Sequence, residues 1–282
     1  MSVLNQTGPA SAPLATPAVK WKLWIYTNYD CNLRCSYCVA KSSPGAARRA
    51  ISLADVCRLV DEAVDLQFDR VFFTGGEPFL LDEIYDMLAY ASARMTTTVL
   101  TNAMLLPQNL PGRRQTRLER LSEIAHTDLV VQVSLDGGRP EHHDPYRGPG
   151  SWAKTVEGLK QLQAAGFRVR IATTETVINT AHLAELCAFH VALGIPEEDH
   201  FVRPLARRGF SREGLELGTH NLEPELTVNR AGIYWHPLST DPDMLVSLQM
   251  FPLAAAVGTV KGQLATLAQT GNMPLIQFHC GT

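Results

Sequence analysis

Residues 22–38, KLWIYTNYDCNLRCSYC, join an apolar run to three closely spaced cysteines. The run Lys22 to Tyr26 is typical of a buried strand, and Cys31, Cys35 and Cys38 follow it closely. In folds that alternate strands and helices, side chains at the carboxyl ends of the strands carry the chemistry. The segment therefore predicts an α/β fold with a thiol-lined site at the end of its first strand.

The alternation continues along the chain as far as residue 206. We expect strands at Lys22 to Tyr26, Arg70 to Thr74, Thr97 to Thr101, Leu129 to Leu135, Arg168 to Thr174 and His200 to Leu205. Helical patterns lie between them, at Ser52 to Leu66, Asp82 to Ala93, Arg114 to Ala125, Ser151 to Ala165 and Thr180 to Leu193. This order predicts parallel strand pairing, in a partial (β/α)6 TIM-like barrel over residues 21–206.

Four residues are expected to define helix ends. Ser52 and Ser151 belong to the residue types that cap a helix amino terminus. Gly166 and Gly194 follow the last two helical patterns, where a left-handed glycine commonly ends a helix.

Both ends of the chain depart from this pattern. Residues 1–20 are rich in Ser, Thr, Ala and Pro, and we expect a disordered leader. Residues 207–282 are expected to form a small α+β appendage. It would contain a hairpin of Glu225 to Val228 with Ile233 to His236, and a helix over Met244 to Ala268.

Composition excludes several classes of protein. The 282 residues are 45% hydrophobic and 19% charged, which is ordinary for a globular protein and unlike a disordered or collagen-like chain. The net charge of -3, without a basic stripe, predicts no nucleic-acid partner. The sequence has no run of 18 apolar residues and no basic segment followed by an apolar one at its start, so we expect no membrane association and a cytoplasmic location.

The cysteine loop indicates a soft metal. Three thiols at this spacing suit zinc or an iron-sulfur cluster, whereas the alternative is three ordinary small apolar residues in a loop. A structural zinc site normally has four ligands in two pairs, and no second pair is present in the sequence. Three protein ligands on a four-iron cluster would leave one iron open to a substrate or cofactor.

The remaining cysteines are scattered. Cys57 and Cys187 lie on apolar faces of predicted helices, and we expect both to be buried small hydrophobic residues. Cys280 is expected to be a free thiol near the end of the chain; a substrate-facing residue or a ligand shared with a histidine are the alternatives. His142 and His143 are expected to be solvated or capping residues and are not assigned to iron.

Polar motifs end three more of the predicted strands. They are Thr74-Gly75-Gly76-Glu77-Pro78, Thr101-Asn102-Ala103 and Ser134-Leu135-Asp136-Gly137-Gly138. Glycines allow a backbone to approach a ligand closely, and hydroxyl, amide and carboxylate groups suit a ribose and an amino acid. Each motif could instead be an ordinary turn.

Together these motifs resemble the radical S-adenosylmethionine (SAM) enzymes. The C-x3-C-x2-C loop, with an aromatic residue before its last cysteine, is similar to the loop that holds a [4Fe-4S] cluster in that family. Residues 75–77 are similar to the family's GGE motif and residues 101–103 to its TNG motif. The stretch His143 to Trp152 resembles the HDxxR…GS segment of anaerobic sulfatase maturases and other peptide-modifying relatives.

The resemblance implies a set of site residues. The cluster ligands would be Cys31, Cys35 and Cys38. The residues in contact with SAM would be Tyr37, Gly75, Gly76, Glu77, Asn102, Ser134, Asp136, Arg147 and Arg203. Within this set the GGE turn would hold the amino group of SAM, Ser134 and Arg147 its carboxylate, and the Tyr37 ring its adenine. The alternatives are that Tyr37 only shields the cluster and that Arg147 forms a surface salt bridge.

The resemblance also implies the reaction. An external one-electron reductant of flavodoxin or ferredoxin type would reduce the cluster, SAM would be cleaved to a 5′-deoxyadenosyl radical, and the radical would abstract hydrogen from a peptide, a protein or a small biosynthetic molecule. The other hypothesis is a non-catalytic iron-sulfur or SAM-binding partner protein. Residues 207–282 resemble a degenerate SPASM or twitch domain, because His236 stands where a cysteine is expected and Cys280 is the appendage's one cysteine. We therefore expect one cluster.

Overall fold

The computed structural model describes residues 20–124 and 128–270. Its strands form a single nine-stranded sheet in the order β6-β5-β4-β3-β2-β1-β7-β8-β9. Consecutive parallel pairing links β1 (Lys22–Asn28), β2 (Arg70–Gly75), β3 (Thr97–Thr101), β4 (Leu129–Ser134), β5 (Arg168–Glu175) and β6 (His200–Pro204). The appendage adds β7 (Leu226–Asn229), β8 (Gly232–Tyr234) and β9 (Leu245–Ser247).

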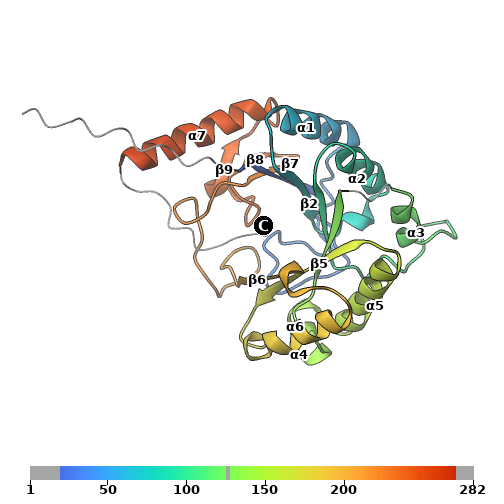
Figure 1. Cartoon of the computed structure of the whole chain (residues 1–282). Coiled ribbons are helices and arrows are strands. Elements are labelled where there is room, and N and C mark those ends of the chain that lie inside the picture. Colours follow the sequence, from blue (N-terminus) through green and yellow to red (C-terminus); the bar gives the residue numbers. More distant parts are fainter. Residues whose placement is uncertain (1–19, 125–127, 271–282) are drawn as a thin grey trace, which may run out of the picture.

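Helices cover the outside of this curved sheet, as Figure 1 shows. They are α1 (Leu53–Asp65), α2 (Ile84–Ser92), α3 (Arg117–Ser122), α4 (Pro140–Arg147), α5 (Ser151–Ala164), α6 (Leu183–Ala192) and α7 (Leu253–Gln269). Short 3-10 turns are η1 (Pro78–Leu80), η2 (Thr180–His182), η3 (Glu197–Asp199) and η4 (Pro242–Met244). The predicted α/β class with a partial barrel is confirmed, and the carboxyl ends of six parallel strands meet at one mouth.

Strand β1 shows why the sheet closes around a core. Successive side chains of a strand point to opposite faces, so Leu23 and Ile25 share one face while Trp24 and Tyr26 share the other. All four are buried. Trp24 and Tyr26 line a cavity inside the barrel, and the Trp24 ring stacks on Phe72 of β2 with centroids 4.0 Å apart. The strand is buried on both faces, as expected for the centre of a parallel sheet.

Several predicted helix ends are confirmed. The Ser52 hydroxyl accepts a hydrogen bond from the backbone N–H of Asp55, 3.1 Å away, at the start of α1. Gly166 and Gly194 have φ angles of 81° and 87°, so both take the left-handed conformation that ends a helix. Ser151 is not the cap of α5, contrary to the prediction. It is the first residue of that helix.

Two helices differ from the prediction. Helix α4 was not predicted from the sequence, because its residues are polar and include the internal Pro145. The predicted helix over Met244 to Ala268 is wrong in its first part, where η4 and β9 lie, and α7 begins only after Pro252. A proline at the amino terminus of a helix supplies no backbone N–H and therefore marks a natural start.

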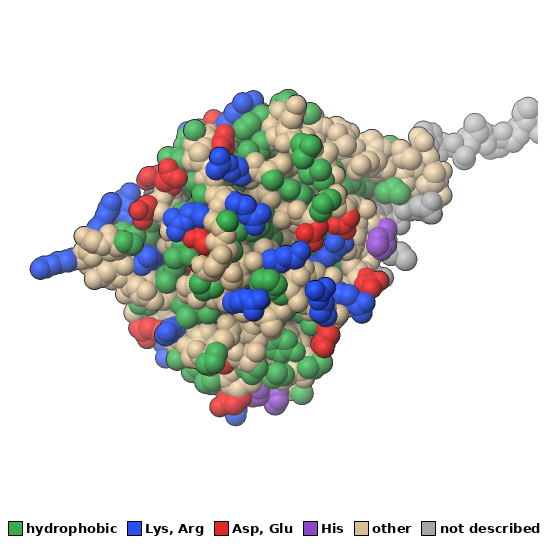
Figure 2. Space-filling model, turned by 180° about the vertical axis from the view of Figure 1, so that it is seen from behind, with side chains coloured by type: hydrophobic (Ala, Val, Ile, Leu, Met, Phe, Trp, Pro, Cys, Tyr) green, Lys and Arg blue, Asp and Glu red, His purple; other side chains and the backbone are tan. Residues whose placement is uncertain are grey.

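The outer surface carries charges of both signs side by side on the face shown in Figure 2. Within the described ranges, none of the helices combines the length and the apolar character needed to cross a bilayer. The predicted leader, residues 1–20, lies outside the described residues except for Lys20, and Cys280 lies outside them as well.

The appendage continues the barrel sheet. Strand β7 pairs parallel with β1, and β8 returns antiparallel as the predicted hairpin. The buried carboxylate of Glu225, just before β7, accepts hydrogen bonds from Lys22 Nζ at 3.0 Å and Trp24 Nε1 at 2.6 Å. Because both donors belong to β1, this carboxylate fastens the hairpin to the centre of the sheet.

Replacing Glu225 with Ala should lower the free energy of unfolding by about 3 kcal/mol, because it removes one partner of a buried ion pair. The control is Glu216→Ala, which removes an exposed carboxylate that pairs with Arg207 and should cost less than about 1 kcal/mol. Denaturant unfolding followed by circular dichroism measures both. Equal losses in the two variants would contradict the role of Glu225.

Candidate active site

The cysteine loop begins three residues after β1 and faces a cavity at the mouth of the barrel. Cys31, Cys35 and Cys38 all line this cavity, which encloses about 1040 Å³ free of protein atoms, counting the part open to solvent. The loop is held locally, since Cys38 N donates to Cys35 O at 3.1 Å. Backbone N–H groups of Leu33 and Ser42 lie 3.4 Å from the sulfurs of Cys31 and Cys38. Such N–H···S contacts orient and stabilise thiolate ligands.

The spacing of the sulfur atoms can be compared with the geometry of a zinc site, one of the two alternatives that the sequence left open. Two other groups of described residues bring three ligand atoms within 4.8 Å of one another, and the cysteine loop is not such a group. Four thiolates around one zinc ion would lie about 3.8 Å apart, given tetrahedral bonds of about 2.3 Å. At least one pair of the three sulfur atoms is therefore farther apart than two ligands of a single zinc ion would be.

Burial makes the loop depend on a cation. Burial raises the pKa of the Cys31 thiol well above its ordinary value, and the nearby Glu77 adds to the effect. Burial also raises the pKa of Cys35 to about 11, although Arg147 opposes the change. Without a metal these two sulfurs stay protonated at neutral pH. Bound iron would replace the protons and supply the positive charge that thiolates need.

The two glycines after β2 are packed against the start of the cysteine loop. A Cβ atom on Gly75 would lie 2.3 Å from the carbonyl oxygen of Asn28, and one on Gly76 would lie 2.0 Å from that of Asp30. Gly76 N donates to Asn28 O at 2.9 Å, and Glu77 N donates to Asp30 O at 3.0 Å. The turn and the loop therefore form one backbone frame that no side chain at these positions could enter.

The Glu77 carboxylate belongs to this frame. It accepts hydrogen bonds from Asn102 N at 2.9 Å, Thr101 Oγ1 at 2.8 Å and Phe79 N at 3.2 Å. The side chain is fully buried and is not among the residues that line the cavity. Burial raises its pKa to about 7, while the three donors oppose the rise. In this structure the carboxylate ties β2 to β3, and Gly75 and Gly76 are the residues of the turn that line the cavity. The contact of Glu77 with SAM stays a prediction.

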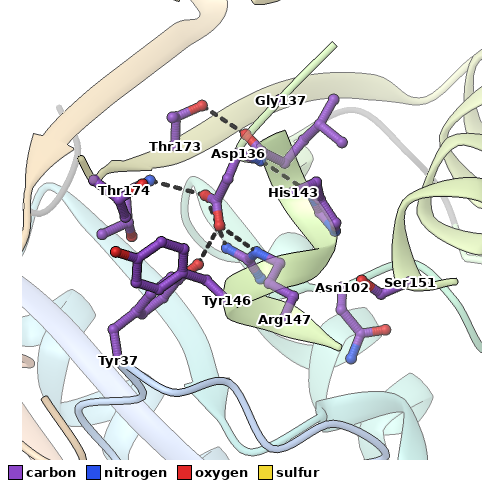
Figure 3. Close-up of polar contacts among 12 residues, drawn as sticks. Tyr37, Asn102, Asp136, Gly137, His143, Tyr146, Arg147, Ser151, Thr173 and Thr174 are labelled. Carbon is purple, nitrogen blue, oxygen red and sulfur yellow. Dashed lines mark hydrogen bonds and ion pairs between the residues drawn. The ribbon is translucent and has the colours of Figure 1, made fainter. Parts of the chain in front are cut away.

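Asp136 lies at the centre of a group of buried polar contacts. Its carboxylate accepts hydrogen bonds from Arg147 Nε at 2.7 Å, from the Tyr37 hydroxyl and from Thr174 N at 3.0 Å (Figure 3). Although burial opposes it, the Arg147 guanidinium holds the pKa of Asp136 below its ordinary value. Asp136 is 1% exposed and is not among the residues that line the cavity, so in this structure it positions Arg147 and Tyr37. Its contact with SAM stays a prediction.

Arg147 and Tyr37 are the groups that Asp136 presents to the cavity. Both line it, and both are buried, which excludes the alternative of a surface salt bridge for Arg147. Arg147 donates two hydrogen bonds to Asp136, one from Nε and one from Nη2 at 3.3 Å. A guanidinium has five N–H donors, so three remain for an anionic group in the cavity.

The HDxxR…GS segment has a structural explanation. His143 and Arg147 lie one turn apart on α4, and His143 Nδ1 accepts from Asp136 N at 3.1 Å. His143 is fully buried, contrary to the expected solvated histidine, and burial lowers its pKa to about 4. Asp144 caps α5 in place of Ser151, accepting from Trp152 N at 2.8 Å. The segment thus fixes α4 and α5 behind the Asp136–Arg147 pair.

The other predicted residues gather at the same mouth. Asn102, Ser134 and Arg203 line the cavity from the ends of β3, β4 and β6. Asn102 Nδ2 donates to Asn32 Oδ1 at 2.8 Å, which joins the end of β3 to the cysteine loop. Arg203 Nε lies 3.5 Å from the Thr174 hydroxyl.

The cavity is also lined by residues that were not predicted as site residues, and four of them illustrate where they come from. Thr74 and Thr174 stand at strand ends, and their position beside predicted motifs could have indicated them. Pro237 and Leu238 come from the appendage, where no sequence signal points to the site. The Tyr26 hydroxyl donates to Pro237 O at 2.5 Å, which holds this wall in place.

Replacing Gly76 with Ala should remove the metal from the loop, because the added methyl forces the Asp30 carbonyl and the cysteines beyond it to move. Overpacking of this kind costs about 2 kcal/mol or more. The matched control is Gly45→Ala, since a Cβ at Gly45 has no neighbour within 4 Å. The measurement is the iron and sulfide content per chain after anaerobic reconstitution of both variants. Full iron content in Gly76→Ala would show that the close packing does not position the loop.

Comparison with known proteins gives one family. The model of the Radical SAM superfamily matches residues 25–187. The chain is 26% identical to the AdoMet-dependent heme synthase of Nitratidesulfovibrio vulgaris over 201 residues, 67% of this chain and 52% of that protein. It is 32% identical to the mycofactocin maturase MftC of Mycobacterium tuberculosis over 190 residues, 65% of this chain and 45% of that protein. The chain thus spans about half the length of these curated relatives.

Solved structures support the fold. The structure of native anSMEcpe with bound AdoMet aligns with a TM-score of 0.65 and 14% identity, over 88% of this chain and 83% of that one. Streptococcus suis SuiB bound to its precursor peptide SuiA aligns with a TM-score of 0.56 and 20% identity, over 72% of this chain and 44% of that one. At these identities the likeness establishes a shared architecture.

Proposed function

We propose that this chain cleaves SAM and uses the resulting radical on a substrate, and the proposal starts from its membership of the radical SAM superfamily. It is therefore an enzyme whose cofactors are a [4Fe-4S] cluster and SAM. When bound, the reduced cluster supplies an electron that cleaves the C5′–S bond of SAM, and the 5′-deoxyadenosyl radical abstracts hydrogen from the substrate. The observation that carries the proposal is that three thiols, a glycine turn and an oriented arginine open onto one cavity.

The chain's own residues have distinct roles in this proposal. Cys31, Cys35 and Cys38 hold the cluster and leave one iron for SAM. Gly75 and Gly76 let the backbone approach the amino group of the methionine part. The three remaining N–H donors of Arg147, with Ser134 beside them, bind its carboxylate, since a planar guanidinium matches a carboxylate in geometry.

The rest of the cavity encloses the nucleoside and excludes water. The Tyr37 ring lines the cavity and its hydroxyl is fixed by Asp136, which suits contact with an adenine. Asn102 and Arg203 are placed to contact SAM or the substrate from β3 and β6. Apolar lining from Trp24, Leu100 and the appendage lowers the local dielectric around these polar contacts.

We propose three units for the chain: a leader at 1–20, the barrel at 21–206 and a degenerate SPASM or twitch domain at 207–282. One cluster is expected, because residues 207–282 hold one cysteine, Cys280. An external flavodoxin or ferredoxin would supply the electron, in the cytoplasm where such donors are kept reduced.

A peptide or protein is the favoured substrate class. The supporting observations are the similarity to a mycofactocin maturase and to SuiB, which was solved with its precursor peptide. The similarity to a heme synthase keeps a small biosynthetic molecule as the alternative. The second candidate function is a non-catalytic SAM-binding partner, favoured by an appendage whose one cysteine is Cys280.

The decisive experiment is SAM cleavage. The full chain, reconstituted anaerobically with iron and sulfide, should form 5′-deoxyadenosine when dithionite and SAM are added. Cys35→Ala should form none, and Cys57→Ala, which removes a cysteine of α1 away from the cavity, should behave as wild type. Tight SAM binding by a fully loaded chain with no 5′-deoxyadenosine, even with candidate peptides present, would favour the non-catalytic partner.

Replacing Arg147 with Lys should weaken SAM binding about tenfold, since the ammonium keeps a charge opposite Asp136 but loses the planar fork. Iron content should not change. Arg139→Lys is the control, because Arg139 is exposed and pairs with Glu185 on the surface. Calorimetric titration of the reconstituted chain with SAM measures the effect. An unchanged dissociation constant would mean that Arg147 serves only to neutralise Asp136.

A further inference from the structure

A second cluster of metal-binding side chains lies between α6 and β6. Cys187 and His190 are three residues apart on α6 and so share a face, and His200 is the first residue of β6. One ligand atom from each of the three residues lies within 4.8 Å of the others. None of the three lines the cavity that holds the cysteine loop. The expectation that Cys57 and Cys187 are buried is wrong for both, since each is half-buried. Cys187 also faces two imidazoles.

The two imidazoles belong to a chain of four short polar contacts. Thr173 Oγ1 lies 2.6 Å from the carbonyl oxygen of Leu135 and 2.8 Å from His200 Nε2. His200 Nδ1 lies 3.1 Å from His190 Nε2. His190 Nδ1 lies 2.9 Å from the carbonyl oxygen of Ile195. Each contact is short enough to need a hydrogen between its two atoms.

Hydrogens can be assigned from both ends of this series of four polar contacts. A carbonyl oxygen only accepts, so the Thr173 hydroxyl must point at Leu135, and His190 must carry a hydrogen on Nδ1. Thr173 has one hydrogen, so the contact with His200 needs a hydrogen on Nε2 of that ring. Neutral His200 then has a bare Nδ1, and neutral His190 has a bare Nε2. The two bare nitrogens are the pair that lies 3.1 Å apart.

Two lone pairs cannot face each other at this distance without something between them. A proton would satisfy this contact by making one ring a cation. The charge is costly on the fully buried His190, which leaves the half-buried His200 as the ring that would carry it. A metal ion satisfies both nitrogens at once. Bonds of about 2.0 Å at a tetrahedral angle would place two nitrogens about 3.3 Å apart, close to the observed separation.

The geometry points to a zinc site made by Cys187, His190 and His200. The outer nitrogens of both rings already donate to protein oxygens, which is the arrangement that orients histidines bound to zinc. The Cys187 thiol contacts the carboxylate of Glu197, which can accept the proton that the thiol loses when it binds a metal. A thiolate and two imidazoles are ligands that zinc accepts. The ion would tie α6 to β6 on a face separate from the radical chemistry.

The zinc content of the holoenzyme tests the proposal. After dialysis against a competing chelator, wild type and Cys57→Ala should each retain one zinc per chain beside the cluster. Cys57→Ala is matched, because Cys57 is also a half-buried cysteine on a helix. Cys187→Ala should retain at least about tenfold less zinc, with unchanged iron and sulfide. No zinc in wild type, or equal zinc in Cys187→Ala, would overturn the proposal.

A second measurement does not depend on cluster loading. In the full chain with Cys31, Cys35 and Cys38 all changed to Ala, added Co²⁺ should give a thiolate charge-transfer band and intense visible bands of a tetrahedral site. A further Cys187→Ala change should abolish the charge-transfer band, while Cys57→Ala should not. Octahedral cobalt spectra without the band in a folded chain would overturn the site, whatever the outcome of the SAM cleavage assay.

Discussion

The close packing of two glycines against the backbone of residues 28–30 is the contact on which the site depends. Gly75 and Gly76 bring the end of β2 so near to the start of the cysteine loop that a single methyl group would overlap a carbonyl oxygen. The position of the loop is thereby set by backbone contacts, which do not change when side chains rotate. Strand β1 leads into this loop and pairs with both β2 and β7. The same strand therefore positions the barrel and the appendage relative to the loop.

Charge is arranged around the cavity in a consistent order. The acidic groups Asp136 and Glu77 lie behind the wall, and each accepts hydrogen bonds from donors of the protein. The cationic groups Arg147 and Arg203 lie in the wall itself. The carboxylates bond to protein donors outside the cavity, while the arginines line it. This arrangement favours an anionic ligand. A cluster held by thiolates and the carboxylate of an amino acid both meet that condition.

Much of this could be predicted from the sequence, because six strands and their helices follow simple apolar periodicity. Helix α4 could not, since His143 and Arg147 stabilise it through contacts with Asp136 and not through an apolar face. The motifs located the site, but they did not show which side chains face the cavity. That choice depends on partners far away in sequence, as when Asn102 N and Thr101 take up the Glu77 carboxylate. The grouping of Cys187 with His200 has the same origin, because pairing of β5 with β6 brings the histidine there.

The appendage shows how a wall of the site can be held by polar contacts. Buried groups on β1 and its loop reach across to it: Trp24 Nε1 donates to Glu225, and Asn229 Nδ2 donates to the Tyr29 hydroxyl at 2.7 Å. Gly209, with φ of 65°, packs so tightly on the cysteine loop that a Cβ there would lie 2.1 Å from Cys38 O. We interpret this region as a domain that has lost its cluster cysteines. On that interpretation, these hydrogen bonds fix the appendage in place, as metal ligands would. A metal site can lose its ion, whereas buried hydrogen bonds persist as long as the sheet does, so this wall is held without an ion of its own.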